Sequence, residues 1–93
     1  MKIYGYEYTV KRNETIDDME AFGDFRAKNQ TIRIASDLCA EQALSTLLHE
    51  ILEAINYHNQ LKLEHSAIMV LEVGIYETLK ANGVDLRPLL ERL

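Results

Sequence analysis

The run TLLHEILEAINY, residues 46–57, decides the fold, because its apolar side chains recur with the period of a helix. At about 100° per residue, one arc of that helix collects the large aliphatic residues Leu44, Leu47, Leu48, Ile51 and Ile55. An amphipathic helix of this kind must bury its apolar arc against another element. We therefore expect a helix that ends near Tyr57 and packs this arc on a sheet.

The opposite side of the same helix carries polar side chains, of which His49 and Glu53 can bind a metal ion. These residues, which we expect to face away from the main core, are Ser45, Thr46, His49, Glu50, Glu53 and Asn56. His49 and Glu53 are four residues apart, so their side chains can converge on one ion. The pattern is a variant of the H-E-x-x-H helix, in which two histidines hold zinc and the glutamate activates water. In this sequence Glu53 stands where that pattern has its second histidine. The alternative interpretation is that these polar residues form a solvated helix face and bind no metal.

The bulk composition is typical of one ordinary globular domain spanning residues 1–93. The net charge of −5, with scattered arginines, argues against a nucleic-acid binder. No apolar run approaches the roughly 18 residues that a membrane span requires, and residues 1–7 lack an apolar signal-peptide core. Cys39 is the only cysteine and cannot form an internal disulfide. We therefore expect a cytoplasmic protein that does not act at a membrane.

Three short strands are expected before this helix. Residues 2–11 alternate loosely and predict a first strand, on which Tyr4, Tyr6, Tyr8 and Val10 share one face. Residues 11–20 are polar and predict a connection with room for a short turn of helix. Residues 21–27 and 31–35 flank a polar tip and predict a hairpin. The expected architecture is α+β, with a small three-stranded antiparallel sheet packed on the helices.

Two more helices are expected around the first. Ser36 or Asp37 can cap the first helix, and a second helix should run from about Glu64 or His65 to Asn82, with Gly83 ending it. Its predicted core stripe is Ile68, Leu71, Ile75 and Leu79, and beside that stripe lie His65, Met69, Glu72 and Tyr76. The short connection makes the two long helices antiparallel neighbours. A last short helix over residues 86–93 would be capped by Asp85 and would cover the core or fold across the cleft.

Five side chains can meet between the two long helices. They are His49, Glu50, Glu53, His65 and Glu72. Three carboxylates in a partly buried space repel one another and resist desolvation unless a cation offsets their charge. Catalytic zinc usually takes three protein ligands and keeps one position for water. The grouping therefore predicts a divalent metal site.

These residues resemble a known family of small phage and prophage gluzincin-like zinc metallopeptidases, the minigluzincins and the ImmA/IrrE-like group. Residues 46–57 are similar to the family's active-site helix, in an H-E-x-x-E variant. Upstream, residues 30–34, Leu38 and residues 41–42 resemble the strand that leads into that helix. Downstream, Leu61, Leu63, Ile68, Leu71 and residues 74–80 match its second, glutamate-bearing helix. The resemblance covers roughly residues 20–83.

The resemblance implies a role for each residue of the group. His49 would be the first metal ligand, Glu50 the general base, and Glu53 would occupy the second ligand position, where the family has histidine. His65 stands near the position where the family has its glutamate ligand, so the exchange keeps two histidines and one glutamate. Glu72 is the alternative third ligand, or a group that orients a histidine. The implied ion is Zn²⁺. Because the Glu53 carboxylate is a harder ligand than the imidazole it replaces, Mn²⁺ and Fe²⁺ compete better with zinc here than at a site with the family's histidine.

Two functions follow from the sequence. The first is a metal-dependent peptidase or amide hydrolase acting on a peptide or protein, with one cognate protein of a mobile element as an alternative target that it would cleave or bind. The second is a catalytically inactive metal-binding or protein-interaction module. Val70 and Val73 lie off the predicted core stripe and favour an apolar patch that a partner or a homo-oligomer would cover. His58 is expected at the surface or in the last helical turn, and Tyr76 as a packing aromatic.

Overall fold

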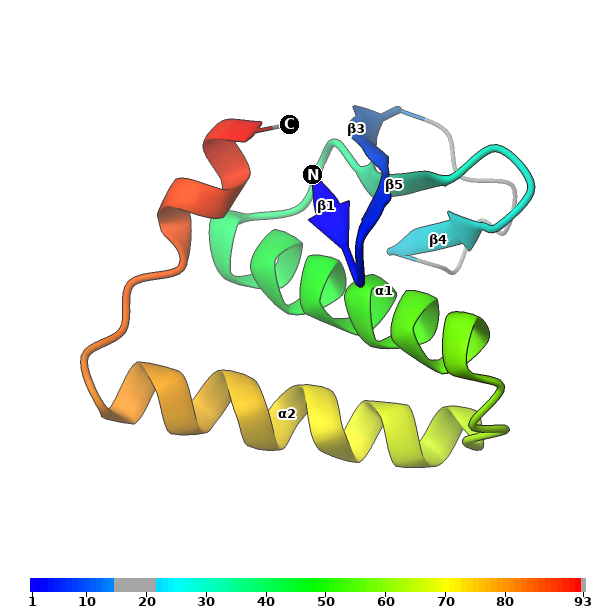
Figure 1. The fold of residues 1–93 in the computed structure, drawn as a ribbon. Helices are drawn as coiled ribbons and strands as arrows, with labels where there is room; N and C mark the ends of the chain where they lie inside the picture. The colour runs from blue at the N-terminus through cyan, green and yellow to red at the C-terminus, as the bar shows by residue number, and fades with distance from the viewer. Residues whose placement is uncertain (15–21, 93) are drawn as a thin grey trace.

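The computed structural model describes residues 1–14 and 22–92, and its class is α+β, as predicted. Within these residues, five short strands precede two long helices, and a short 3-10 helix follows them (Figure 1). The helix α1 (Ala40–Asn59) lies between the strands on one side and α2 (His65–Ala81) on the other. No helix among these residues is long and apolar enough to cross a bilayer.

In the part of the chain that the structure describes, the main sheet is mixed and has three strands in the order β3-β5-β4. The strand β5 (Thr31–Ala35) pairs antiparallel with β4 (Gly23–Arg26), which confirms the predicted hairpin. It also pairs in parallel with β3 (Thr9–Asn13), so the expectation of an all-antiparallel sheet was wrong. The central position of β5 buries Ile32 and Ile34 completely. The sheet core therefore forms around the strand that leads into α1.

The N-terminal segment is a small hairpin followed by a strand, and the prediction of one strand over residues 2–11 was wrong. β1 (Lys2–Ile3) pairs antiparallel with β2 (Tyr6–Glu7) around Tyr4 and Gly5, whose φ angles are 51° and 82°. Two consecutive residues with positive φ form the tight turn that suits a two-residue hairpin. The turn changes the facing of the tyrosines, so Tyr8 is buried while Tyr4 and Tyr6 stay exposed.

The residues between β3 and β4 fall partly outside the described chain. The predicted polar connection over residues 11–20 begins instead as strand, because β3 continues to Asn13. The suggested turn of helix falls on residues 15–20, which lie outside the described residues. Arg12 donates hydrogen bonds to the carbonyl oxygens of Ala35, Ser36 and Leu38. These hydrogen bonds connect β3 to the segment that joins β5 to α1.

Helix α1 begins later than predicted and is rotated about its axis relative to the prediction. Its N-cap residue is Cys39, without a side-chain cap, so neither Ser36 nor Asp37 caps it. The residues of α1 that are buried are Ala43, Leu44, Thr46, Leu47, Glu50 and Ala54, whereas Leu48, Ile51 and Ile55 are half-buried. Small side chains at Ala43 and Ala54 let the helix lie close to the sheet. The expectation that Thr46 and Glu50 face away from the core was therefore wrong.

Helix α2 runs antiparallel to α1 and ends where predicted, at Asn82 and Gly83, whose φ is +76° (Figure 1). Of the predicted core stripe, Ile68 alone is buried, while Leu71 and Ile75 are 42% and 37% exposed. The prediction therefore placed the buried side of α2 at the wrong rotation about the helix axis. The side turned toward α1 carries Ile68 and Glu72.

The C-terminal segment forms a 3-10 helix, η1 (Arg87–Arg92), where an α-helix over residues 86–93 was expected. The Asp85 carboxylate accepts the backbone N–H of Arg87, as a capping residue does. Leu89 and Leu90 pack against the hydrophobic core, and Leu93 lies outside the described residues. Figure 1 shows η1 beside the start of α1 and close to the N-terminus.

Candidate metal centre

Three side chains that can ligate a metal converge between α1 and α2. The ligand atoms of His49, Glu53 and His65 all lie within 4.8 Å of one another. His49 and Glu53 project from successive turns of α1, and His65 is the first residue of α2. The two imidazole rings meet edge to face, with centroids 5.0 Å apart. Together, these three residues could hold a metal ion.

The spacing of this group is close to that of a metal site. Ligands that bind an ion at about 2.0–2.2 Å in tetrahedral geometry lie roughly 3.4 Å from one another. In the protein the ligand atoms of the three residues lie up to 4.8 Å from one another, which is wider than this separation. His65 is exposed and Glu53 is half-buried. Binding an ion would require the ligand atoms to move closer together than they lie in the protein.

The carboxylate of Glu72 fixes the orientation of the His49 ring. Nδ1 of His49 and Oε1 of Glu72 lie 2.8 Å apart, and the Ser45 hydroxyl donates to the other carboxylate oxygen. An ionised carboxylate only accepts, so Nδ1 carries the proton and donates it. Nε2 is then the nitrogen of His49 with a free lone pair. Such carboxylate–histidine contacts typically orient metal-ligating histidines.

Glu50 is a buried carboxyl group next to the ligand group. Its side chain is 5% exposed. Burial, followed by the negative charges of Glu53, Asp24 and Glu72, raises the pKa of Glu50 to about 8. A divalent cation close by would oppose all of these effects, because it stabilises the ionised form. The site therefore has the excess of negative charge that a cation would balance.

A pocket of about 500 Å³ is lined by two of the three ligand residues, His49 and His65, whereas Glu53 does not line it. Its lining includes His49, Glu50, His65 and Glu72 from the helices and Phe22 and Gly23 at the start of β4. Gly23 allows the strand to approach α1 closely, since a Cβ there would lie 2.8 Å from Cγ2 of Thr46 and 2.6 Å from the Arg33 carbonyl oxygen. Among the strands that the structure describes, β4 lies at one edge of the sheet. The pocket thus lies between the ligand group and a strand edge.

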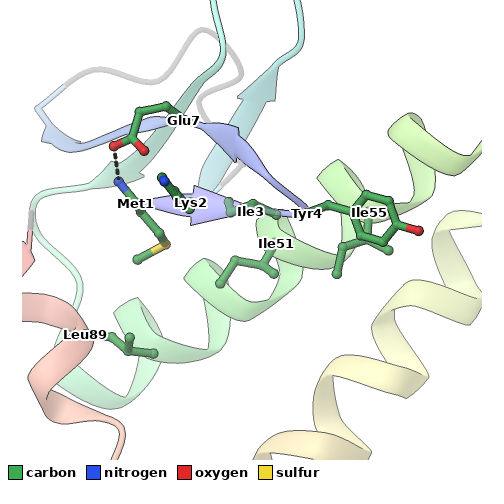
Figure 2. Close-up of a pocket in the computed structure, with 8 residues that line it drawn as sticks. All are labelled: Met1, Lys2, Ile3, Tyr4, Glu7, Ile51, Ile55 and Leu89. Atoms are coloured by element: carbon green, nitrogen blue, oxygen red, sulfur yellow. Dashed lines mark hydrogen bonds and ion pairs between the residues drawn. The ribbon is translucent and has the colours of Figure 1, made fainter.

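A larger cavity, of about 730 Å³, lies elsewhere on the molecule. Figure 2 shows it between the N-terminal residues, Ile51 and Ile55 of α1, and Leu89 of η1. The N-terminal ammonium group pairs with Glu7 at its edge, at 3.2 Å. Within the described chain, η1 contributes Leu89 to this cavity. It contributes no lining residue to the pocket of about 500 Å³ beside His49 and His65, which is called the metal pocket below. The described part of the C-terminal segment therefore does not line the candidate site.

The remaining histidine and Tyr76 lie away from the ligand group. His58 is in the last turn of α1, as predicted, but it is half-buried: its ring stacks on Tyr6, with centroids 3.8 Å apart. Its Nε2 also hydrogen-bonds to the Tyr8 hydroxyl. Tyr76 lines a separate pocket beside Glu41 and Lys80. Neither residue lines the metal pocket.

Two residues at the site were missed in the sequence, and a third, Ser45, was placed on the polar side of the helix but was given no role there. Ser45 lies four residues before His49 on the same helical face, and that spacing could have indicated it. Asp24 adds to the negative charge at Glu50 and accepts a 2.8 Å hydrogen bond from Nε of Arg33. Gly23 carries no local signal of its role, because the contact depends on how the sheet and helix meet.

Comparisons of the chain with protein-family models, with curated proteins and with solved structures found no match. The geometry of the chain defines a small α+β protein with a group of residues that could hold a metal ion.

Proposed function

We propose that this protein is a metal-dependent hydrolase of peptide or amide bonds, of the kind that the minigluzincin-like sequence pattern implies. The observation that carries the proposal is the convergence of the His49, Glu53 and His65 ligand atoms within 4.8 Å. Glu50 lines the same pocket and is the residue that the pattern assigns as general base. In this proposal two histidines and one glutamate hold the ion, and Glu72 orients His49.

The chemistry is hydrolysis by a water molecule that Glu50 activates. A divalent ion in the site would act as a Lewis acid on the carbonyl and make the attacking water more acidic. Glu50 accepts a proton from this water as its oxygen attacks the carbonyl carbon. The carbon–nitrogen bond then breaks, and Glu50 passes the proton to the leaving amine.

The position of β4 favours an extended peptide as the substrate. β4 is at the edge of the sheet, and Phe22 and Gly23 at its start line the pocket. An exposed strand edge can bind an extended peptide through backbone hydrogen bonds. A peptide bound there would pass the ligand group and present a carbonyl to it. The exposed ring of Phe22 offers an apolar contact to a substrate side chain.

Zn²⁺ is the proposed ion, with Mn²⁺ and Fe²⁺ as alternatives. The two imidazoles suit zinc, whereas the carboxylate of Glu53 is a harder ligand that also suits manganese and ferrous iron. Its negative charge reduces the polarising power of the ion. We therefore expect slower hydrolysis than an ion held by three neutral ligands would give.

The test is hydrolysis of a quenched-fluorescence peptide library by protein loaded with each ion in turn. Glu50→Gln should keep the bound ion and lose activity by about 10²–10⁴-fold, the usual contribution of a general base. His49→Ala should lose both the ion and the activity, and His58→Gln should keep the ion. Equal turnover by wild type and Glu50→Gln, with both proteins carrying the ion, would contradict the proposal.

A second candidate function is a metal-binding module without catalysis, acting through protein contacts. The uncharged, exposed side of α2 favours it, since Val70 and Val73 are 72% and 56% exposed. In that case the ion would have no coordination position open to water. X-ray absorption spectroscopy of the loaded protein separates the two functions, because a closed set of protein ligands supports the module and an open position supports the hydrolase.

A further inference from the structure

We propose that Asn56 is a positioning residue for the candidate metal site, because it holds the linker between α1 and α2 in the shape that brings His65 to His49 and Glu53. The inference rests on the proposed function, since it takes these three residues as the ligands of one ion. It concerns the one ligand that α1 does not supply. His65 is exposed, so the hydrophobic core does not hold its side chain in place.

The linker, residues 60–64, has to lead the chain back along α1. The ligand atoms of His65 and Glu53 lie within 4.8 Å of each other, whereas α1 continues for six residues beyond Glu53 to Asn59. Six residues correspond to about 9 Å of helix. Figure 1 shows the linker as the turn that joins the two antiparallel helices at one end of the molecule. The position of His65 therefore depends on the conformation of the linker.

The linker has an unusual backbone conformation, although all of it is exposed to solvent. Each residue from 60 to 64 is exposed, including Leu61 and Leu63, which are 52% and 38% exposed. Gln60 and Lys62 have φ angles of 51° and 57°, in the left-handed region that residues other than glycine rarely adopt. Such a conformation persists only where other interactions determine it. Because apolar burial is small here, hydrogen bonds have to hold the linker.

Asn56 accepts hydrogen bonds from the linker with both its backbone and its side chain. Its carbonyl oxygen accepts the N–H of Leu61 at 3.1 Å, and its side-chain oxygen Oδ1 accepts the N–H of Leu63 at 3.0 Å. The first bond belongs to the common pattern in which a helix ends at a left-handed residue. The second bond is additional to that pattern and reaches two residues further along the chain. It fixes the backbone two residues before His65 begins α2.

Asn56 also lies on the side of α1 that carries the other two ligands. It follows Glu53 by three residues, and Glu53 follows His49 by four, so the three side chains lie on one face of the helix. Asn56 is half-buried, as Glu53 is. One face of α1 thus supplies two ligands directly and sets the position of the third through the linker.

A double-mutant cycle on Zn²⁺ affinity tests the proposal, because it separates the positioning of His65 from general damage to the fold. Asn56→Ala should weaken Zn²⁺ binding about tenfold, the lower end of the effect of residues that orient metal ligands. In a His65→Ala background the same change should alter the affinity by less than about twofold, since the ligand that Asn56 positions is already absent. Competition with a chelating dye measures wild type, both single variants and the double variant.

Two further variants are controls. Asn59 lies in the same last turn of α1, but its side chain donates within the helix, to the carbonyl oxygen of Ile55 at 2.9 Å. Asn59→Ala should therefore bind Zn²⁺ as wild type does. Asn56→Asp keeps an acceptor oxygen for the N–H of Leu63, so it should bind at least as tightly as wild type.

Hydrogen exchange of the Leu63 amide in the wild type is the measurement to use if Asn56→Ala does not fold. The amide should exchange about tenfold more slowly than in an unstructured chain, because Asn56 holds it. An unprotected amide would overturn the proposal.

The cycle also distinguishes this proposal from the metal site on which it rests. If Asn56→Ala binds Zn²⁺ normally while His65→Ala binds it weakly, the positioning role alone is wrong. An equal loss of affinity in both backgrounds, or an Asn56→Asp variant as weak as Asn56→Ala, would refute it too. A wild type that binds no Zn²⁺, or a His65→Ala variant that binds it as tightly as wild type, would overturn the metal site and this proposal together.

Discussion

His49 on α1 donates from Nδ1 to the carboxylate of Glu72 on α2 over 2.8 Å, which ties the two helices together at the candidate site. Both side chains are 16% exposed. Glu72 also accepts a hydrogen bond from Ser45, so its position is fixed from two sides. The contact leaves Nε2 of His49 as the nitrogen that can hold an ion.

Replacing Glu72 should weaken metal binding without removing a ligand. In Glu72→Gln the amide no longer provides a charged acceptor for Nδ1, and we expect affinity for Zn²⁺ to fall by about 10- to 100-fold. Competition with a chelating dye measures this change. Glu77→Gln, on an exposed turn of the same helix, should bind as wild type does. Equal affinity of the Glu72 and Glu77 variants would show that Glu72 does not orient His49.

Glu50 should make the stability of the metal-free protein fall as pH rises. Its folded pKa is about 8, above the ordinary value of 4.5. The folded state therefore holds a proton that the unfolded state releases between these values, so wild type loses stability with rising pH across this window. Glu50→Gln lacks this contribution, and its advantage over wild type should grow by a few kcal/mol from pH 4.5 to pH 8. Urea unfolding in the presence of chelator checks the difference, and a constant offset would contradict it.

Gly23 should not tolerate even a methyl group. In Gly23→Ala the Cβ would lie 2.6 Å from the Arg33 carbonyl oxygen, in the central strand of the sheet. Because that backbone cannot move freely, we expect a loss of about 1–3 kcal/mol in the free energy of unfolding. Gly74→Ala is the matched control, since its Cβ meets nothing and the helix gains up to about 1 kcal/mol. The prediction fails if thermal unfolding ranks the two variants in the reverse order.

The Tyr8 hydroxyl should contribute to stability through His58. Tyr8 is 2% exposed and its hydroxyl bonds to Nε2 of the histidine. Tyr8→Phe removes the bond and leaves the ring packing unchanged, which should cost about 1 kcal/mol. Tyr4→Phe removes a hydroxyl from a side chain that is 63% exposed, and its denaturation midpoint should match wild type. Equal midpoints for both variants would mean that the bond contributes nothing.

The sequence predicted those elements that are determined by residues close together in the chain. The helical spacing of α1 and α2, the β4–β5 hairpin and the end of α2 at Gly83 are confirmed. The parallel pairing of β3 with β5 was not predictable, because its register joins Thr9 to Thr31 across the chain. The turn at Tyr4 and Gly5 was not predicted, because the alternating tyrosines favoured one continuous strand. Gly5 was the one residue whose type indicated a turn there.

The candidate site was predictable as far as helix geometry determines it. Four-residue spacing placed His49 and Glu53 on one face, and the short connection placed His65 across from them, as the structure also has it. The burial of Glu50 was not predictable, because it depends on how α1 is rotated about its axis against the sheet. That rotation follows from the packing of small residues such as Ala43, which periodicity alone does not reveal.

The central claim is that His49, Glu53 and His65 together hold one divalent ion. Anomalous scattering at the zinc edge, from crystals grown with Zn²⁺, tests it most directly. The account predicts one peak at about 2.0–2.2 Å from an imidazole nitrogen of His49, an imidazole nitrogen of His65 and a carboxylate oxygen of Glu53. No peak between these residues, or a peak bound by other side chains, would contradict it.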